Sequence, residues 1–179
     1  MDLWRELPIR DPNGNLQVVV ESPRGSELKL KYNADSDRFT WSRALPSGLR
    51  FPHDYGFIPQ TLSGDGDALD ALIYSSVASF PGIIVPARPI GTLRMEQLRE
   101  GQPAKRNDRL VVIPTNDHRL AHITSSDDLP ERVRQEIQSF FEASLGLTGK
   151  RVGFLGWAGL SETDKLIDSA HQAMLAQDP

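Results

Sequence analysis

The sequence predicts a mainly β fold with some α-helix: a small β-barrel or curled sheet, with two helices packed outside it near the C-terminus. Two observations support this fold class. Short β-like segments separated by Gly, Pro, Asn and Asp fill the first two thirds of the chain, and the last third changes to helical spacing. With 179 residues, of which 39% are hydrophobic and 25% charged, the chain is expected to form a single domain, residues 1–179.

The expected strands are segments in which apolar and β-branched residues run between turn-forming residues. They comprise residues 17–21, 28–32, 38–41, 70–74, 83–95, 109–113 and 152–157. In segment 28–32 a period of two places Lys29 and Lys31 on one face of the strand. Residues 51–62 are expected to supply core and turn, and the loop 96–108 to be the least structured part of the chain.

Two helices are predicted after residue 126. The first follows Asp127-Asp128-Leu129-Pro130, where an acidic cap and an early proline indicate its start, and Gly146 suits its end. The second starts near Leu160-Ser161-Glu162-Thr163-Asp164, which resembles a capped helix start with a preceding apolar residue. Apolar residues at helical spacing mark both helices: Val133, Ile137, Phe140, Phe141, Leu145, Leu166, Ile167, Ala170 and Met174.

Composition and charge argue against several classes of protein. The formal net charge of −4 disfavours binding to nucleic acid through phosphate neutralisation. No apolar run approaches the roughly 20 residues that span a bilayer, and no signal peptide is visible, so no membrane partner is expected. The chain has no cysteine, which excludes disulfides and thiolate metal sites and is compatible with the cytoplasmic location that we expect.

The strongest local signal is the acidic loop, residues 63–70. Asp65, Asp67 and Asp70 lie within six positions, together with two glycines, directly before the apolar segment 71–74. Carboxylates this close repel one another unless a cation neutralises them, and their hard oxygens suit Mg²⁺ or Ca²⁺ rather than zinc. For an isolated Asp-Gly-Asp the commoner interpretation is a turn with solvated charges.

The acidic loop and the stretch before it resemble the signature of a known enzyme family. Residues 51–62 read Phe-Pro-His-Asp-Tyr-Gly-Phe-Ile-Pro-Gln-Thr-Leu, and together with Asp-Gly-Asp-Ala-Leu-Asp at 65–70 they resemble the family I soluble inorganic pyrophosphatases. Shorter matches extend the resemblance from residue 18 to residue 157: segments 18–26, 80–82, 88–91, 110–114, 127–130 and 140–142. The resemblance implies a small closed β-barrel of the oligonucleotide-binding type with flanking helices.

The resemblance also implies hydrolysis of inorganic diphosphate to two phosphates with several Mg²⁺ ions, or with Mn²⁺ or another divalent ion in their place. Asp65 and Asp70 match carboxylates that hold the metals around the attacking water, and Glu21 matches an acid of the outer metal sphere. Asp67 matches the general base. Metals that share a water lower its pKa, and a nearby carboxylate can then accept its proton.

Three further residues match substrate contacts of the family. Lys29 and Tyr55 match ligands of the attacked phosphate, and Arg43 matches a ligand of the leaving phosphate. Taken singly, each residue has an ordinary interpretation: Lys29 as a solvated strand charge, Arg43 as a surface ion pair and Tyr55 as a core ring. Their joint occurrence in register favours the functional interpretation.

The chain departs from the family pattern at positions that bind metal. Lys31 stands where the family has a second acid on the strand. Gln97 and Asn107 stand where the family has two further metal-binding aspartates, and Glu96 and Asp108 could replace them only if the loop shifts by one residue. Because an ammonium group can also neutralise phosphoryl oxygens, Lys31 is expected to bind substrate as a fixed cation.

The side that binds the leaving phosphate departs further. Arg109 replaces a lysine and is expected to bind substrate. On the first helix, Ser144-Leu145 replaces the Tyr-Lys pair that grips the leaving phosphate, and Phe51 lacks the hydroxyl of the usual tyrosine. Arg43 is therefore the one leaving-phosphate ligand that the alignment retains.

Three hypotheses of function remain open. The first is hydrolysis of inorganic diphosphate with reduced or retuned metal use. The second is hydrolysis of another phosphoanhydride, whose organic leaving group Lys105, Arg106 and Arg109 could contact. The third is a catalytically weak or inactive binding protein, which the acidic loop disfavours because its carboxylates would lack a cation. By resemblance to bacterial members of the family, the protein is also expected to be a homo-oligomer, a hexamer.

Overall fold

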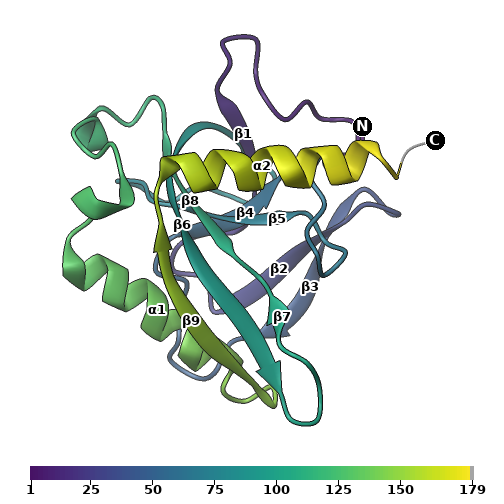
Figure 1. The fold of residues 1–179 in the computed structure, drawn as a ribbon, viewed down its shortest axis with the longest axis vertical. Helices are drawn as coiled ribbons and strands as arrows, with labels where there is room; N and C mark the ends of the chain where they lie inside the picture. The colour runs from purple at the N-terminus through teal and green to yellow at the C-terminus, as the bar shows by residue number, and fades with distance from the viewer. Residues whose placement is uncertain (178–179) are drawn as a thin grey trace.

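The computed structural model describes residues 1–177, which form nine strands, two α-helices and two short 3-10 helices (Figure 1). The strands are β1 (Leu16–Ser22), β2 (Leu28–Asn33), β3 (Arg38–Ala44), β4 (Asp54–Ile58), β5 (Leu69–Ile73), β6 (Ile84–Arg99), β7 (Lys105–Arg106), β8 (Arg109–Pro114) and β9 (Lys150–Ala158). The helices are η1 (His118–Leu120), η2 (Ser126–Asp128), α1 (Glu131–Leu145) and α2 (Leu160–Leu175). In these residues no helix is both long and apolar enough to cross a bilayer.

Five strands form a closed ring in the order β1–β4–β5–β8–β6, because β1 pairs with both β4 and β6. Val19 lies at the closure, opposite Phe57 of β4 and Ile84 of β6. Within the ring β5 and β8 are parallel, and the other neighbours are antiparallel. The small closed β-barrel with two C-terminal helices that the sequence predicts is therefore confirmed.

Two extensions of the ring carry residues of the site. From Thr92 to Arg99, β6 pairs with β9, and Figure 1 shows these two strands running side by side away from the ring. The strands β2 and β3 form a separate antiparallel hairpin. The hairpin and the β6–β9 pair thus provide side chains beyond the end of the ring.

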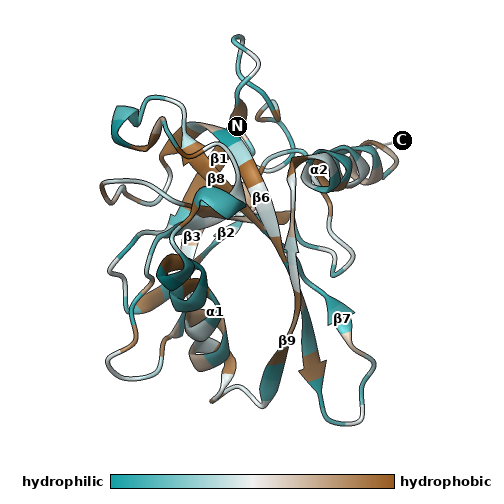
Figure 2. Cartoon of the chain, turned by 60° about the vertical axis from the view of Figure 1, so that its left-hand side comes forward, coloured by the Kyte–Doolittle hydropathy of each residue, from teal (hydrophilic) through white to brown (hydrophobic). Residues whose placement is uncertain are grey.

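The core lies on both faces of the ring strands, and each helix covers one face. In β8, Leu110 belongs to the buried cluster that includes Ile167 of α2, whereas its neighbour Val111 belongs to the cluster that includes Ile137 of α1. Figure 2 shows hydrophobic residues concentrated on the ring strands, while much of α1 is hydrophilic. Because successive strand residues point to opposite faces, a strand that is apolar throughout is buried on both sides.

The strand β4 was missing from the sequence prediction, which gave residues 51–62 as core and turn. Its backbone pairs with β1 and with β5, so the strand arises from long-range pairing rather than from local composition. Gly56 is required for this pairing, because a Cβ atom at this position would lie 1.9 Å from the carbonyl oxygen of Val19. Gly56, which the sequence predicted as a turn residue, therefore allows β4 and β1 to approach closely.

The prediction that the loop 96–108 is the least structured part of the chain was wrong. The strand β6 continues to Arg99, and its end pairs with β9 on one side and with the short strand β7 on the other. Glu96 lies opposite both Gly153 and Arg106, so the backbone hydrogen bonds of two neighbours order this segment.

Both predicted helix starts need correction. Asp127 and Asp128 belong to η2, where the Asp128 carboxylate accepts the backbone N–H of Ser125, and α1 begins after Pro130 without a side-chain cap. The second helix begins at Leu160 with Gly159 in the cap position, so Ser161 lies inside it. The predicted positions of the helices and the end of α1 at Gly146 are confirmed.

Candidate active site

A cavity of about 390 Å³ is lined by residues of β1, β2, β6, β8 and β9 and by the acidic loop, residues 63–70. The predicted site residues on its wall are Glu21, Lys29, Lys31, Asp65, Asp67, Asp70 and Arg109. Arg43 and Tyr55 line a smaller hollow of about 40 Å³, which shares Lys29 and Arg109 with the large cavity. The fold thus brings residues from eight strands and from α1 around two adjoining spaces.

The acidic loop is held by its own backbone. Ser63 N–H donates to the carbonyl of Asp67, and Gly66, at a positive φ of 90°, donates back to Ser63. The Asp67 N–H also donates to a carboxylate oxygen of Asp65. The turn leads into β5, in which Asp70 follows the buried Leu69, so the loop directs its carboxylates toward the cavity.

Lys31 forms an ion pair with the predicted general base. Its Nζ lies 2.8 Å from Oδ1 and 2.8 Å from Oδ2 of Asp67. About half of each side chain is exposed. A shift in strand register between Lys29 and Leu30 separates the two lysines, yet both line the same cavity, as their shared strand face predicted.

Arg109, which is buried, and Asp70, which is partly exposed, form an ion pair in the wall of the cavity. Arg109 Nη1 lies 2.6 Å from Asp70 Oδ2, and the guanidinium lies over the rings of Tyr55 and Phe141. Arg109 also donates to the side chain of Asn107. Burial raises the pKa of Tyr55 well above its usual value, and the carboxylate of Asp70 raises it further, so the hydroxyl stays protonated and can donate a hydrogen bond.

Glu21 is the most deeply buried carboxylate of the cavity. Burial raises its pKa to about 7, and repulsion from Asp70 adds to this, although the backbone N–H of Tyr32 donates to Glu21 Oε1 at 2.6 Å. Near neutral pH the group is therefore close to half protonated. A cation that binds here would release a proton, which makes its affinity depend on pH.

The two remaining predicted cations lie deeper than a solvated surface charge would. Burial lowers the pKa of Lys29, and Arg109 and Arg43 act in the same direction, while Asp70 opposes them. Burial also lowers the pKa of Arg43, which lines the small hollow beside Tyr55. Lys29 Nζ lies 5.7 Å from the centre of the Tyr55 ring.

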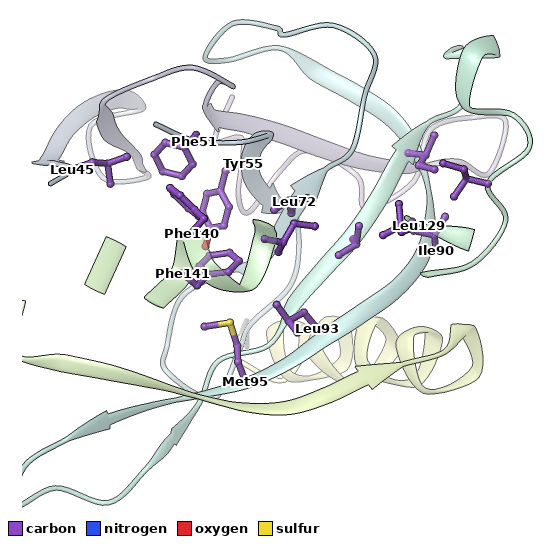
Figure 3. Close-up of a cluster of buried hydrophobic side chains, with 14 residues drawn as sticks. Leu45, Phe51, Tyr55, Leu72, Ile90, Leu93, Met95, Leu129, Phe140 and Phe141 are labelled. Atoms are coloured by element: carbon purple, nitrogen blue, oxygen red, sulfur yellow. The ribbon is translucent and has the colours of Figure 1, made fainter. Parts of the chain in front are cut away.

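The small hollow is mainly apolar on the side of α1. Phe51, Phe140 and Phe141 pack against Tyr55 in one aromatic group, as Figure 3 shows, with Phe51 and Phe140 ring centres 4.9 Å apart. The remaining lining residues of this hollow are Leu45, Gln97, Ser144 and Leu145. The Ser144 hydroxyl donates to a carbonyl of its own helix, so α1 directs no charged group into the hollow.

The substituted positions of the β6–β8 region also face the large cavity. Gln97 and Asn107 both line it. Glu96 and Asp108, the predicted replacements, do not: Asp108 accepts hydrogen bonds from the backbone N–H of Met95 and from Arg106. Two neutral amides, those of Gln97 and Asn107, therefore face the cavity at the positions where the family resemblance implies metal-binding aspartates.

Lys150 is a lining residue that the sequence analysis missed. It lies on β9, and its Nζ donates to Oε1 of Gln97 at 3.2 Å. No local motif marks this lysine, because only the pairing of β9 with β6 brings it to the cavity. Lys105 and Arg106, suggested as contacts for a larger substrate, are exposed on β7 and line neither space.

The carboxylates of the cavity have the donor chemistry of a Mg²⁺ site, since Glu21, Asp65 and Asp70 offer hard oxygen ligands. Within residues 1–177, however, no three acidic or histidine side chains gather closely enough to hold one ion. Asp70 is instead held by Arg109, and Asp67 by Lys31. The cavity is thus neutralised in part by its own cations.

Comparisons with known proteins agree with this geometry. The family model "Inorganic pyrophosphatase" matches residues 18–175. The inorganic pyrophosphatase of Thermus thermophilus is 40% identical over 157 residues, covering 86% of this chain and 87% of that protein. The inorganic pyrophosphatase of Nostoc sp. is 34% identical over 173 residues, covering 97% of this chain and 99% of that protein.

Solved structures give the same result. The crystal structure of the T. thermophilus inorganic pyrophosphatase superposes with a TM-score of 0.88 at 35% identity, covering 97% of this chain and 99% of that one. The structure of the Helicobacter pylori enzyme gives a TM-score of 0.85 at 29% identity, covering 95% and 99%. With its closed ring, its acidic loop and these matches over nearly the whole chain, the protein belongs to the inorganic pyrophosphatase family.

Proposed function

We propose that this protein hydrolyses inorganic diphosphate to two phosphates. One observation carries the proposal: in a chain of the inorganic pyrophosphatase family, five carboxylates and five cations face one cavity of about 390 Å³. Carboxylates can bind metal and accept a proton, and cations can bind phosphoryl oxygens, so both halves of the reaction have residues in one space.

Lys29, Arg43 and Tyr55 bind the substrate in this proposal. Lys29 and Tyr55 contact the attacked phosphate, and Arg43 contacts the leaving phosphate from the small hollow. The buried, protonated hydroxyl of Tyr55 is a hydrogen-bond donor to a phosphoryl oxygen. Lys31 and Arg109 add two more cations on the wall of the cavity. Charge-assisted hydrogen bonds of this kind stabilise the charge that develops as the bridging bond breaks.

Asp67 acts as the general base that accepts the proton of the attacking water. Its carboxylate lies on the wall of the cavity, within reach of solvent, and Lys31 fixes its orientation through both oxygens. The pair keeps the carboxylate in place but also occupies its oxygens. Proton transfer therefore requires Lys31 to move toward a phosphoryl oxygen, which offers the ammonium an alternative partner.

Asp65, Asp70 and Glu21 would hold Mg²⁺, or Mn²⁺ or another divalent ion in its place. The ion would supply a water of lowered pKa and charge that neutralises phosphoryl oxygens. Arg109 and the backbone of Tyr32 hold the carboxylates of Asp70 and Glu21 in the cavity wall, and Glu21 has to lose its proton before it can bind a cation. Binding of the ion is therefore expected to be stronger above neutral pH than below it.

The small size of the second space supports diphosphate over a substrate with an organic leaving group. The hollow of Arg43 measures about 40 Å³, and aromatic side chains close it on the side of α1. An organic group larger than a phosphate has no matching space there. Lys105 and Arg106 are exposed on β7 and line neither space.

Phosphate release from diphosphate with Mg²⁺ tests the function. We expect native protein to turn over diphosphate and Asp70→Asn to lose at least about a hundredfold in kcat/KM, because a metal ligand becomes a neutral amide. Asp164→Asn, which neutralises an exposed carboxylate on α2, is the matched control and should retain native activity. Absence of turnover in native protein, or equal turnover in the Asp70 variant, contradicts the proposal.

We also propose that the enzyme works in the cytoplasm, to which the cysteine-free sequence is suited. Fractionation of cells that produce the protein from its native gene should recover the activity with cytoplasmic markers. Recovery with an envelope fraction contradicts this location.

A further inference from the structure

Lys150 is a cation of the large cavity without a carboxylate partner. Strand alternation turns Lys150, Val152 and Phe154 inward, where Val152 and Phe154 pack against the core, and turns Arg151 outward into solvent. Nζ of Lys150 is hydrogen-bonded to the neutral side chain of Gln97. Among residues 1–177 no carboxylate lies within salt-bridge distance of this ammonium.

The other cations near Lys150 fall into two groups. Lys31 and Arg109 are neutralised by neighbouring aspartates. Lys29, Arg43 and Lys150 form no ion pair in the described part of the chain. These three cations therefore have no carboxylate within ion-pair distance in the described residues, and each of them lines one or both of the two spaces.

Gln97 connects the three cations in space. It lines both the large cavity and the small hollow, as Lys29 does, while Arg43 lines the hollow and Lys150 the cavity. A phosphate dianion at the junction of the two spaces, the wall that Gln97 shares between them, would therefore have unpaired cations on both sides of it.

We propose that Lys150 is a phosphate-binding residue of the active site, which takes the leaving phosphate at this junction together with Arg43. Gln97 is its positioning residue, because its amide oxygen holds the ammonium at the wall shared by the two spaces. The proposal rests on the diphosphatase function proposed above. Lys150 would supply a cation from β9, whereas all the residues that α1 contributes to the hollow, Phe140, Phe141, Ser144 and Leu145, are uncharged.

Calorimetric titration with inorganic phosphate tests this role without turnover. At fixed low ionic strength, Lys150→Met should weaken phosphate binding by at least about tenfold, since a charged hydrogen-bond donor is lost. The matched control Arg151→Met removes the same charge from the outward face of the same strand and should bind phosphate as native protein does. Lys150→Arg should keep most of the affinity.

Gln97→Leu separates positioning from a structural role. It should weaken phosphate binding in the native background and have no further effect in the Lys150→Met background, because its action passes through the ammonium. Additive losses in the double variant overturn the positioning role. A thermal unfolding scan of each variant confirms that it is folded, and Lys150→Gln replaces Lys150→Met if the latter is not.

Three results overturn the proposal: no phosphate binding by native protein, unchanged binding by Lys150→Met, or equal weakening by Lys150→Met and Arg151→Met. Diphosphate hydrolysis measured on the same samples keeps the two proposals distinct. Native protein that binds phosphate through Lys150 but releases none from diphosphate contradicts the function and supports the site. Active native protein with no effect of Lys150→Met contradicts the site alone.

Discussion

Two aspartates of the cavity already have cationic partners, and this pairing governs how the cavity can take up metal. Asp67 is held by Lys31, and Asp70 by Arg109. A divalent ion at either carboxylate has to compete with the cation that is already there. The Lys31–Asp67 ion pair is half exposed, so it contributes little to stability. Its main effect is to reduce the negative charge that would attract a divalent ion to the cavity.

Replacing Lys31 by an acid should therefore strengthen metal binding. In Lys31→Glu a repelling ammonium becomes an attracting carboxylate beside Asp67, and we expect the affinity for Mn²⁺ or Mg²⁺ to rise at least about tenfold. Calorimetric titration of the metal-free protein measures this directly, in the absence of substrate. Lys165→Glu, the same change at an exposed site on α2, is the control. Equal affinities in native protein and Lys31→Glu contradict the competing role of Lys31.

The buried carboxylate of Glu21 should make stability depend on pH. Its pKa is raised to about 7 in the folded protein from an ordinary value of 4.5. The folded state therefore binds more protons than the unfolded state between these values, and the free energy of unfolding falls as pH rises through this window. Below about pH 4.5 both states bind the proton, so the penalty is absent there.

Glu21→Gln should remove this dependence, because the amide cannot ionise and its oxygen can still accept the N–H of Tyr32. Relative to native protein, the variant should gain up to about 3 kcal/mol in free energy of unfolding between pH 5 and pH 8. Urea unfolding at both pH values, with a chelator present, measures the gain. A difference between variant and native protein that is the same at pH 5 and pH 8 contradicts it.

At the scale of single elements, β4 depends on Gly56 for its place in the ring. A Cβ atom there would lie 1.9 Å from the carbonyl oxygen of Val19, so Gly56→Ala should force β1 and β4 apart and cost about 3 kcal/mol or more. Thermal and urea unfolding measure the loss. Gly64→Ala is the control, since nothing lies within 4 Å of a Cβ atom at that position. Equal stability of the two variants contradicts the close contact.

The same strand shows which parts of the fold local sequence could predict. Segments with alternating or continuous apolar residues, such as 28–32 and 109–113, were predicted close to their observed bounds. The strand β4 was not, because Gly56 satisfies a distant partner in β1 rather than a local rule. Local composition also gave no sign that β6 would continue to Arg99, since β7 and β9 pair with it from later in the chain.

For the candidate site, too, local sequence predicted some residues and missed others. Asp65, Asp67 and Asp70 stand together in one loop, so their sequence alone indicated a cation site, and the family resemblance linked them to Lys29. Lys150 carries no such signal. It reaches the cavity only through the register of β9 against β6, which depends on contacts between distant segments.

At the scale of the whole molecule, hydrogen bonds connect both the N-terminal segment and the C-terminal helix α2 to residues 61–62 in the middle of the chain. The indole N–H of Trp4 donates to the carbonyl of Thr61, and the N–H of Leu62 donates to the carbonyl of Ala170 in α2. The N-terminal segment and the last helix are thus both tied to the loop that leads to the acidic residues. We propose on this basis that residues 1–179 form a single domain.

Three exposed apolar residues lie close together in the chain and bear on the homo-oligomer that the family resemblance implies. Val77, Phe80 and Ile83, in the segment between β5 and β6, are 61%, 70% and 43% exposed. Apolar residues this exposed and this close in the chain suit a contact between copies. We therefore expect native protein to have the mass of an oligomer in light scattering, and of a hexamer if the family resemblance extends to assembly.

Phe80→Glu should reduce the mass to that of a smaller species at micromolar concentration, because a carboxylate buried in an apolar contact has no partner. Leu147→Glu is the matched control, since Leu147 is 83% exposed and belongs to a different segment of the chain, the turn after α1. A thermal unfolding scan of each variant checks that it is folded, so a loss of mass in Phe80→Glu alone assigns the contact to this segment. A monomeric native protein, or an unchanged mass in Phe80→Glu, contradicts the assignment and leaves the exposed side chains without a role in assembly.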